Sequence, residues 1–293
     1  MKPTGMFGPV WTAMVTPFQP SGEIDFTACG ELIDHLLKTG TDVLVVGGTT
    51  GESPVLSNEE KLALFSFCVK HVGGKAPVIA GTGSNDTKGT IALTKAAEKT
   101  GVQGAMLVTP YYSKPSQAGL QAHFTAVAEA TTLPIMLYNV PGRTGVNMVA
   151  ETTIALSAVP NIVAVKEASG DLAQIESIIK QVPDTFAVYS GDDGLTLPVL
   201  ELGGDGIVSV VSHVIGDEMQ ALVRAFHTGR DEEAQQLQDN IVPVVEALFA
   251  APNPTCVKYA LNKQGVHVGE VKLPLVPANE QEQALVNQVL AHR

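Results

Sequence analysis

Short apolar runs recur along this chain, and most are followed by a stretch in which apolar residues return every three or four positions. Strands of a buried parallel sheet read as near-continuous hydrophobic runs, whereas the longer period is that of an amphipathic helix. Turn residues such as glycine and proline bound the runs, as expected for strands. The predicted strands are Val10–Val15, Val43–Gly47, Pro77–Ala80, Gly104–Val108, Ile135–Tyr138, Ile162–Lys166, Ala187–Ser190 and Gly206–Val210.

The stretches between the predicted strands carry the start signals of helices. Ser57 precedes Glu60 at the spacing of a capping box, and Asp86 stands just ahead of another helical stretch. The predicted helices in this part of the chain are Thr27–Lys38, Asn58–His71, Thr87–Lys99, Gln117–Ala130, Leu172–Lys180 and Leu195–Leu202.

The alternation of strands and helices predicts an α/β fold, and a (β/α)8 TIM barrel suits a chain of 293 residues. A doubly wound open sheet is the alternative, which the absence of a GxGxxG motif after the first strand disfavours. Beyond the eighth strand the pattern is helical, in Asp231–Phe249, Thr255–Lys263 and Glu280–Ala291. We therefore expect a catalytic barrel over residues 1–225 and a C-terminal helical region over residues 226–293.

The composition limits the cellular compartment and the partners that this barrel can have. No apolar run approaches the roughly 20 residues needed to cross a bilayer, and the N-terminus lacks the hydrophobic core of a signal peptide. The three cysteines are far apart, which argues against a disulfide framework and fits a reducing cytoplasm. A net charge of −12 argues against nucleic acid and leaves a few local cations to hold any anionic substrate. We expect a cytoplasmic protein without membrane or nucleic-acid partners.

Metal chemistry fits the sequence poorly. None of the seven histidines stands near another at ligand spacing. Asp192 and Asp193 could hold Mg²⁺ with Glu167, although the capping of a turn after the seventh strand explains the pair more simply. A serine hydrolase is unsupported as well, because no GxSxG motif follows a strand. We expect no metal site.

Lys166 is the first candidate for a reactive centre because it ends the sixth apolar run. Barrel enzymes place catalytic residues at the C-terminal ends of strands. Among apolar walls, desolvation disfavours the ammonium and lowers the pKa of a lysine, and a neutral amine forms a Schiff base with a carbonyl carbon. The alternative for an isolated strand-end lysine is that it reaches solvent or pairs with Glu167.

Other predicted strands also end in polar, glycine-rich segments. Gly47–Ser53 offers backbone N–H groups beside two hydroxyls, which suits a carboxylate, although a tight turn alone also requires glycines. Tyr111, Tyr112 and Tyr138 fall at two strand ends, where a phenol can shuttle protons, although tyrosines are more often core or rim residues. Arg143 lies in a Pro-Gly turn, where a guanidinium can clamp a carboxylate or simply face solvent.

Together these segments resemble those of the dihydrodipicolinate synthase family, within the pyruvate-dependent class I aldolases. The matching segments are GTTGES at Gly48–Ser53, VTPYY at Val108–Tyr112, YNVPGRTG at Tyr138–Gly145, VKEASG at Val165–Gly170 and SGDD at Ser190–Asp193. They follow successive strands in order, and the resemblance extends to Pro252–Pro254. It implies that pyruvate and aspartate β-semialdehyde condense through a lysine Schiff base to 4-hydroxy-tetrahydrodipicolinate, in diaminopimelate and lysine biosynthesis. It also implies no cofactor, because the imine is the electron sink.

The resemblance further implies a role for each matching residue. Lys166 would form the imine with pyruvate, and Tyr138 would carry protons beside it. Thr49 would link Tyr138 to Tyr112, which in this family reaches into the site of a neighbouring subunit. The implied substrate contacts are Thr49 and Thr50 with the pyruvate carboxylate, Arg143 with the carboxylate of the aldehyde, and Gly191 and Val208 as pocket lining.

Other members of the superfamily remain open as alternatives. A sialate or 2-keto-3-deoxy sugar-acid lyase would use the same lysine chemistry, but sialate lyases typically lack the arginine that stands here as Arg143. A catalytically inactive binding homologue should have lost Lys166 or Tyr138, and both are present. Through Tyr112 the resemblance implies a homo-oligomer, usually a tetramer built as a dimer of dimers.

One departure from the family concerns inhibition by lysine. Lysine-inhibited members use a tyrosine and an asparagine that match Tyr111 and Asn85. They also use a histidine or acid and a glutamate, at positions occupied here by Lys61 and Gly89. A lysine ligand would meet a like charge at the first of these positions and lose a carboxylate partner at the second. The sequence therefore predicts weak or absent inhibition by lysine.

Overall fold

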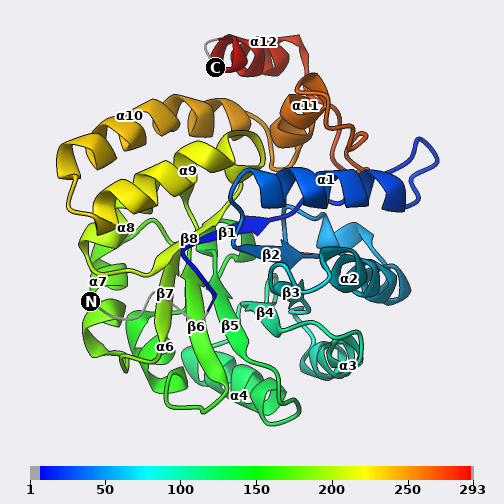
Figure 1. The fold of residues 1–293 in the computed structure, drawn as a ribbon. Coiled ribbons are helices and arrows are strands. Elements are labelled where there is room, and N and C mark those ends of the chain that lie inside the picture. Colours follow the sequence, from blue (N-terminus) through cyan, green and yellow to red (C-terminus); the bar gives the residue numbers. More distant parts are fainter. Residues whose placement is uncertain (1–6, 292–293) are drawn as a thin grey trace.

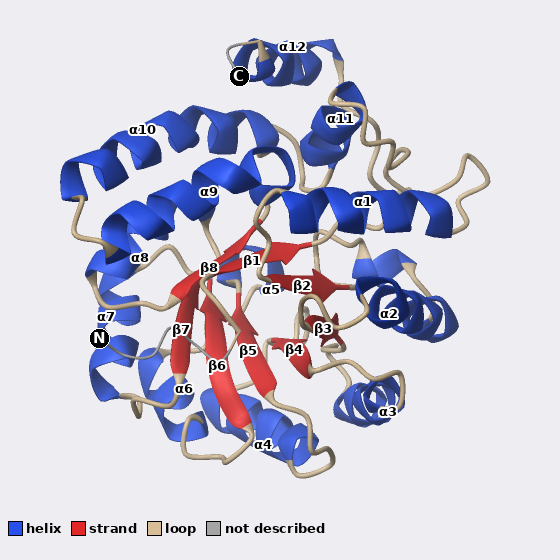
Figure 2. Ribbon diagram, in the orientation of Figure 1, coloured by secondary structure: helices blue, strands red, loops and turns tan. Residues whose placement is uncertain are grey.

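The computed structural model describes residues 7–291, and in it eight parallel strands close into a barrel in chain order. The last strand pairs with the first, so the barrel is complete and an open sheet is excluded. Helices surround the strands (Figures 1 and 2). The (β/α)8 TIM barrel predicted from the sequence is confirmed. The strands are β1 Val10–Ala13, β2 Val43–Val46, β3 Val78–Gly81, β4 Gly104–Val108, β5 Ile135–Asn139, β6 Ile162–Glu167, β7 Ala187–Ser190 and β8 Gly206–Ser209.

Two helices, α2 and α3, begin at the capping residues expected from the sequence. The Ser57 hydroxyl accepts the Glu60 N–H at 3.1 Å, and the Glu60 carboxylate accepts the Ser57 N–H at 2.7 Å, which completes the predicted capping box. Asp86 caps α3 by accepting the N–H groups of Lys88 and Gly89. The helices of the barrel are α1 Phe26–Lys38, α2 Asn58–Val72, α3 Thr87–Glu98, α4 Gln117–Ala128, α5 Pro141–Thr144, α6 Ala150–Leu156, α7 Leu172–Gln181, α8 Thr196–Glu201 and α9 Ser212–His227, with single 3₁₀ turns at Ser53–Val55 and Asp193–Leu195.

Three helices lie outside those predicted from the sequence: the long α9 after β8 and two short helices after β5. α6 reads Ala-Glu-Thr-Thr-Ile-Ala-Leu, and its β-branched residues lower helix propensity, so the sequence gives little sign of it. α5 is a single turn that begins at Pro141 and ends before Gly145, whose φ of 76° is left-handed and favours glycine. This turn carries Arg143.

The C-terminal helices pack against one side of the barrel. They are α10 Asp231–Leu248, α11 Thr255–Lys263 and α12 Glu280–Leu290. α10 runs beside α9, and α11 and α12 continue this layer past α1 (Figure 1). One hydrophobic cluster extends from Leu36 and Phe65, in α1 and α2, to Ile241 and Leu261 in the C-terminal helices. The predicted helical extension is therefore present and shares its core with the barrel.

Side chains alternate between the inside and the outside of the barrel along each strand, as the pleat requires. In β6, Ala164 belongs to the interior cluster that includes Trp11, whereas Val165 packs among the surrounding helices. By the same alternation Lys166 points into the barrel and Glu167 points out of it. Both side chains are buried, but in different environments.

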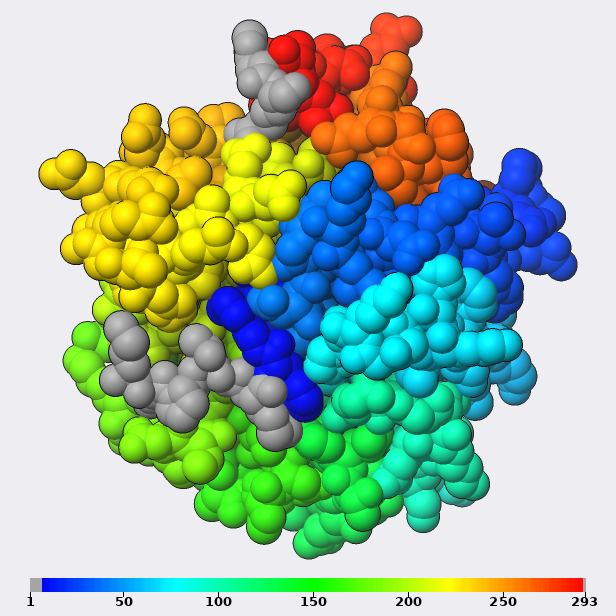
Figure 3. All heavy atoms as spheres, viewed as in Figure 1, coloured from blue at the N-terminus to red at the C-terminus, as the bar shows by residue number. Residues whose placement is uncertain are grey.

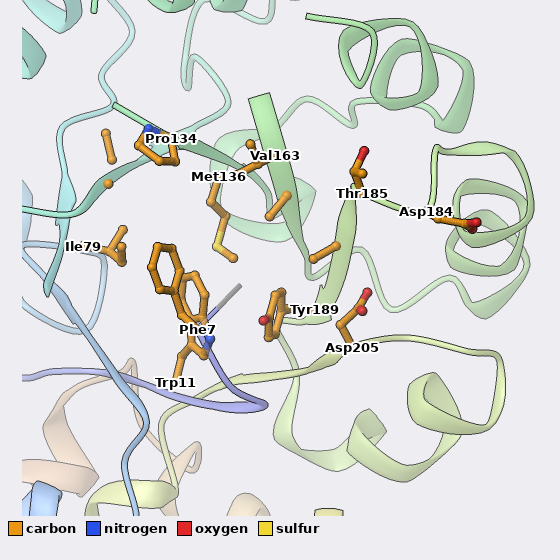
Figure 4. A pocket seen from close by; sticks show the side chains of 14 residues that line it. Phe7, Trp11, Ile79, Pro134, Met136, Val163, Asp184, Thr185, Tyr189 and Asp205 are labelled. Carbon is orange, nitrogen blue, oxygen red and sulfur yellow. The ribbon is translucent and has the colours of Figure 1, made fainter. Parts of the chain in front are cut away.

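A cavity of about 420 Å³ lies at the end of the barrel where the strands begin. The rings of Trp11 and Tyr189 line it with centres 4.8 Å apart, and Met136 lies across from them (Figure 4). The Tyr189 hydroxyl donates to the carbonyl of Gly8 at 3.0 Å, so the start of the described chain, dark blue in Figure 3, is tied down here. Catalytic groups of TIM barrels lie at the opposite end, which is where the candidate site is found.

Candidate active site

Lys166 lies at the C-terminal end of β6 with its side chain inside the barrel and 4% exposed. Its Nζ is 4.4 Å from the centre of the Tyr138 ring, which occupies the paired position on β5. On the β7 side, a Cβ at position 191 would lie 3.0 Å from Cε of Lys166 and 2.7 Å from Cβ of Ala168. Because Gly191 has no side chain, the Lys166 side chain can occupy this space. The structure brings these three predicted residues together.

Glu167 is not the partner of Lys166, because the two side chains leave opposite faces of the strand. The Glu167 carboxylate accepts hydrogen bonds from Nδ2 of Asn139 at 3.1 Å, the N–H of Ser169 at 2.8 Å and Nε2 of Gln174 at 3.2 Å. Burial raises the pKa of Glu167, and these hydrogen bonds oppose the rise. The alternative in which Lys166 pairs with its neighbour or reaches solvent does not hold.

The outward-facing groups behind the site were missed in the sequence. Asn139 donates to Oδ1 of Asn147 at 2.8 Å and accepts the N–H of Met148 at 3.0 Å. Gln174 accepts from Nδ2 of Asn147 at 2.8 Å. These bonds tie the chain after α5 back to β5 and so fix the turn that carries Arg143. Asn139 follows Tyr138 directly, and strand alternation was the signal that could have assigned it to the outer face.

The turn Gly47–Ser53 follows β2 and lies at the same end of the barrel. Gly47 has a φ of 70°, so the tight turn itself requires a glycine there. Thr49 is partly exposed and lines a cavity. Thr50 is buried, and its Oγ1 accepts a hydrogen bond from Nδ2 of Asn253 at 2.9 Å. The turn thus presents one threonine to the cavity and anchors the other behind it.

The cavity beside this turn measures about 780 Å³. Its cationic side chains are Lys61, Lys114 and Arg143, and no acidic side chain is among its described lining residues. Burial lowers the pKa of Lys61. Such a cavity suits small substrates that carry carboxylates. The residues singled out in the sequence that line it are Thr49, Lys61, Tyr111, Tyr112, Tyr138 and Arg143.

Three of the predicted substrate contacts, Thr50, Gly191 and Val208, are not among the described residues that line this cavity, and neither is Lys166. Val208 packs in the barrel interior in the same cluster as Tyr138. Thr50, as described above, is buried against Asn253. Gly191 lies against Lys166, and Lys166 in turn lies beside Tyr138, which does line the cavity.

Tyr112 has an unusual setting for an aromatic residue. Its side chain is 88% exposed, and its backbone φ of 69° is left-handed, which is rare for a bulky residue. The N–H of Tyr112 donates to the carbonyl of Thr144 at 3.2 Å, which ties it to α5. A strained backbone of this kind is typical of functional positions. The ring contributes to the cavity edge but leaves most of its surface uncovered by its own chain.

The two acids of the SGDD segment have structural partners. Oδ2 of Asp193 accepts the N–H groups of Val210 at 3.0 Å and Val211 at 3.3 Å, and Oδ1 of Asp192 accepts the Gly194 N–H at 2.9 Å. Asp192 therefore caps the turn after β7, as expected, whereas Asp193 holds the chain that follows β8. Within residues 7–291, no three or more His, Cys, Asp or Glu side chains gather in a way that could hold a metal ion. None of the described helices has the length and apolar character of a membrane span.

Comparison with known proteins finds relatives over nearly the whole chain. Residues 6–293 match the model of the dihydrodipicolinate synthetase family. The 4-hydroxy-tetrahydrodipicolinate synthase of Bacillus velezensis is 56% identical over 284 residues, which cover 97% of this chain and 98% of that protein. The enzyme of the same name from Bacillus subtilis is 55% identical over 286 residues, covering 97% and 99%.

Solved structures of similar proteins share the fold closely. A dihydrodipicolinate synthase from Bacillus anthracis superimposes with a TM-score of 0.97 at 52% identity, covering 99% of both chains. The corresponding protein from Cyanidioschyzon merolae, solved with lysine bound, gives a TM-score of 0.96 at 46% identity, covering 98% of both chains.

Proposed function

The chain belongs to the dihydrodipicolinate synthetase family, and we propose that Lys166 is the residue that carries pyruvate as a Schiff base. The protein is a lyase of diaminopimelate and lysine biosynthesis, which condenses pyruvate with aspartate β-semialdehyde to 4-hydroxy-tetrahydrodipicolinate. The observation that carries the role of Lys166 is its position: buried inside the barrel at the end of β6, with Nζ 4.4 Å from the Tyr138 ring.

The proposed chemistry needs an amine, a proton carrier and two carboxylate contacts. The amine of Lys166 attacks C2 of pyruvate, and loss of water gives the imine. Tyr138 accepts a proton from C3, and the electron pair moves into the imine to give an enamine. The enamine C3 bonds to the aldehyde carbon, whose oxygen takes up a proton. The amino group of the semialdehyde then attacks C2, which closes the ring and releases Lys166.

We further propose a substrate contact for each of the matching residues at this end of the barrel. Thr49 and Thr50 hold the pyruvate carboxylate at the turn after β2, and Arg143 holds the carboxylate of the semialdehyde from α5. Gly191 and Val208 form the apolar walls beside Lys166. No cofactor enters the proposal, because the lysine imine withdraws the electrons.

We also propose that the enzyme is a cytoplasmic homo-oligomer. Thr49 relays protons between Tyr138 and Tyr112, and Tyr112 is supplied by the neighbouring subunit in a tetramer built as a dimer of dimers. The exposure and left-handed backbone of Tyr112 support this assignment. The barrel over residues 1–225 carries the chemistry, and the helical region over residues 226–293 supports it.

The decisive experiment measures pyruvate consumption by the purified protein with and without aspartate β-semialdehyde. Consumption that depends on the semialdehyde, together with a borohydride-trapped pyruvate adduct on Lys166, is the expected result. A protein that consumes no pyruvate with the semialdehyde but cleaves a sugar acid would be an aldolase of another specificity. A protein that leaves no adduct would be a binding homologue. The two Bacillus relatives described above carry the name of the synthase.

A further inference from the structure

The C-terminal helical region reaches the turn after β2 through two buried polar contacts. Asn253, between α10 and α11, donates from Nδ2 to Oγ1 of Thr50 at 2.9 Å. Lys258, in α11, places Nζ 2.7 Å from Oε1 of Glu52. The four side chains are between 1% and 6% exposed, so water screens neither contact.

Glu52 is held in a conformation that it would not adopt freely. Its φ of 55° is left-handed, which is unfavourable for a residue with a side chain. Oε1 of Glu52 faces Lys258, and Oε2 accepts the N–H of Lys272 at 2.8 Å. The Glu52 N–H donates to the carbonyl of Thr49 at 3.0 Å. The contacts that hold the Glu52 side chain therefore also hold the turn that carries Thr49.

Lys258 is buried in a setting that fixes its direction. Its Nζ donates to the carbonyl of Glu270 at 3.0 Å and lies 4.2 Å from the centre of the Phe18 ring. Lysine is almost never fully buried unless it is paired. A buried ion pair adds little to stability, because the removal of both charges from water offsets their attraction. The definite consequence of this pair is a fixed geometry for Glu52.

We infer that Glu52, Lys258 and Asn253 are positioning residues for the carboxylate of pyruvate, so that the C-terminal helices form part of the binding site for the first substrate. The inference rests on the proposed function, in which Thr49 and Thr50 contact this carboxylate. Asn253 occupies a lone pair of the Thr50 hydroxyl and leaves its proton to be donated to the substrate. The contacts of Glu52 with Lys258 and Lys272 fix the conformation of the turn that carries both threonines.

Kinetic constants for the two half-reactions distinguish a role in positioning the substrate from a role in folding. The ratio kcat/KM for pyruvate reports imine formation, whereas kcat/KM for the semialdehyde reports the second half-reaction. In Asn253→Asp, the new carboxylate accepts the Thr50 proton and repels the substrate. We expect kcat/KM for pyruvate to fall roughly 10- to 100-fold, the effect of a lost hydrogen bond to a charged group. The value for the semialdehyde should stay within about twofold, and Asn253→Ala should lie between Asn253→Asp and wild type.

The ion pair is tested by single and paired substitutions. Lys258→Met leaves the buried charge of Glu52 without a partner and should lower both stability and kcat/KM for pyruvate. In the double variant Glu52→Gln/Lys258→Met no unpaired charge remains, so the urea midpoint should recover while kcat/KM for pyruvate stays depressed. Lys263→Met is the matched control, since Lys263 is an exposed lysine on the same helix. The control should keep wild-type constants.

The other possible outcomes show whether the positioning role or the proposed function itself is wrong. A double variant that regains both stability and kcat/KM for pyruvate would show that the ion pair is structural only. Asn253 variants that lower both kcat/KM values equally would overturn the role of Asn253. If Lys258→Met does not fold, the double variant and Asn253→Asp still carry the test. Wild-type protein that traps no pyruvate on Lys166 would refute the proposed function itself.

Discussion

Neighbouring residues at the strand ends do different work because their side chains leave opposite faces of the sheet. Tyr138 and Lys166 face each other inside the barrel, where the proposed chemistry takes place. Asn139 and Glu167, one position further on, are hydrogen-bonded to each other on the outside. A single residue step therefore separates a reacting group from a group that supports it.

Tyr138→Phe removes the proposed proton carrier and leaves the ring in place. We expect kcat to fall by about 10²- to 10⁴-fold, the usual contribution of general acid–base catalysis. The urea midpoint should change little, because the phenyl ring still fills its place in the barrel interior. Steady-state kinetics and an unfolding curve check the two statements, and a kcat within threefold of wild type would exclude Tyr138 as the proton carrier.

We expect the sensitivity of the enzyme to lysine to depend on Lys61. It lines the cavity, and its cation would repel the ammonium group of a lysine ligand. A carboxylate at position 89 would also be crowded, since a Cβ there would lie 2.7 Å from Oδ2 of the capping Asp86. We expect activity to be unchanged at submillimolar lysine, and Lys61→Glu to bind lysine more tightly by calorimetry. Half-inhibition of the wild type below 1 mM would contradict this prediction.

The ends of β6 and β7 fit together only if position 191 has no side chain. A Cβ there would press on Ala168 and on Cε of Lys166. Gly191→Ala should cost about 1–3 kcal/mol of stability through overpacking. It should lower kcat by roughly 100-fold or more, since a displacement of about 1 Å at the reacting group has effects of this size. Gly119→Ala, within α4, is the control and should keep full activity. Similar kcat values for the two variants would show that the contact between β6 and β7 does not position Lys166.

The strands could be predicted from the sequence because each is a compact apolar run, and the helix starts because Ser57 and Asp86 are local signals. α6 could not, because its threonines disfavour a helix that packing nonetheless imposes. The inward site residues stood at strand ends within recognisable segments. The hydrogen bond from Asn253 to Thr50 could not be predicted, since the two residues are 203 positions apart and only the closed barrel brings them together.

The contact between the chain after β1 and the chain after β8, where the barrel closes, depends on a neutral histidine. His213 accepts the N–H of Val15 through Nε2 at 3.1 Å and donates from Nδ1 to the carbonyl of Val210 at 2.8 Å, which joins the chain after β1 to the chain after β8. Burial lowers the pKa of His213 to about 4. The unfolded chain binds this proton near pH 6.5, so the stability contribution is complete above that pH and is lost as the pH falls toward 4.

We therefore expect the free energy of unfolding to fall more steeply between pH 7 and pH 4 in wild type than in His213→Gln, by on the order of 3 kcal/mol. Glu167 and Asp193 act in the opposite direction, because burial raises the pKa of both carboxyls and favours the folded state at low pH. The difference between the two proteins, from urea titrations at each pH, isolates His213. Parallel pH profiles would show that this contact tolerates a charged imidazole.

The exposed ring of Tyr112 has a consequence for inheritance as well as for catalysis. If each site combines the lysine of one subunit with the tyrosine of another, two inactive alleles can rescue each other. Mixed subunits of Tyr112→Phe and Lys166→Ala would contain one intact site per dimer, so unfolding and refolding them together should restore activity that neither shows alone. A mixture that stays inactive would show that Tyr112 acts only in the active site of its own subunit. Complementation would mean that the unit of selection for this activity is the pair of subunits.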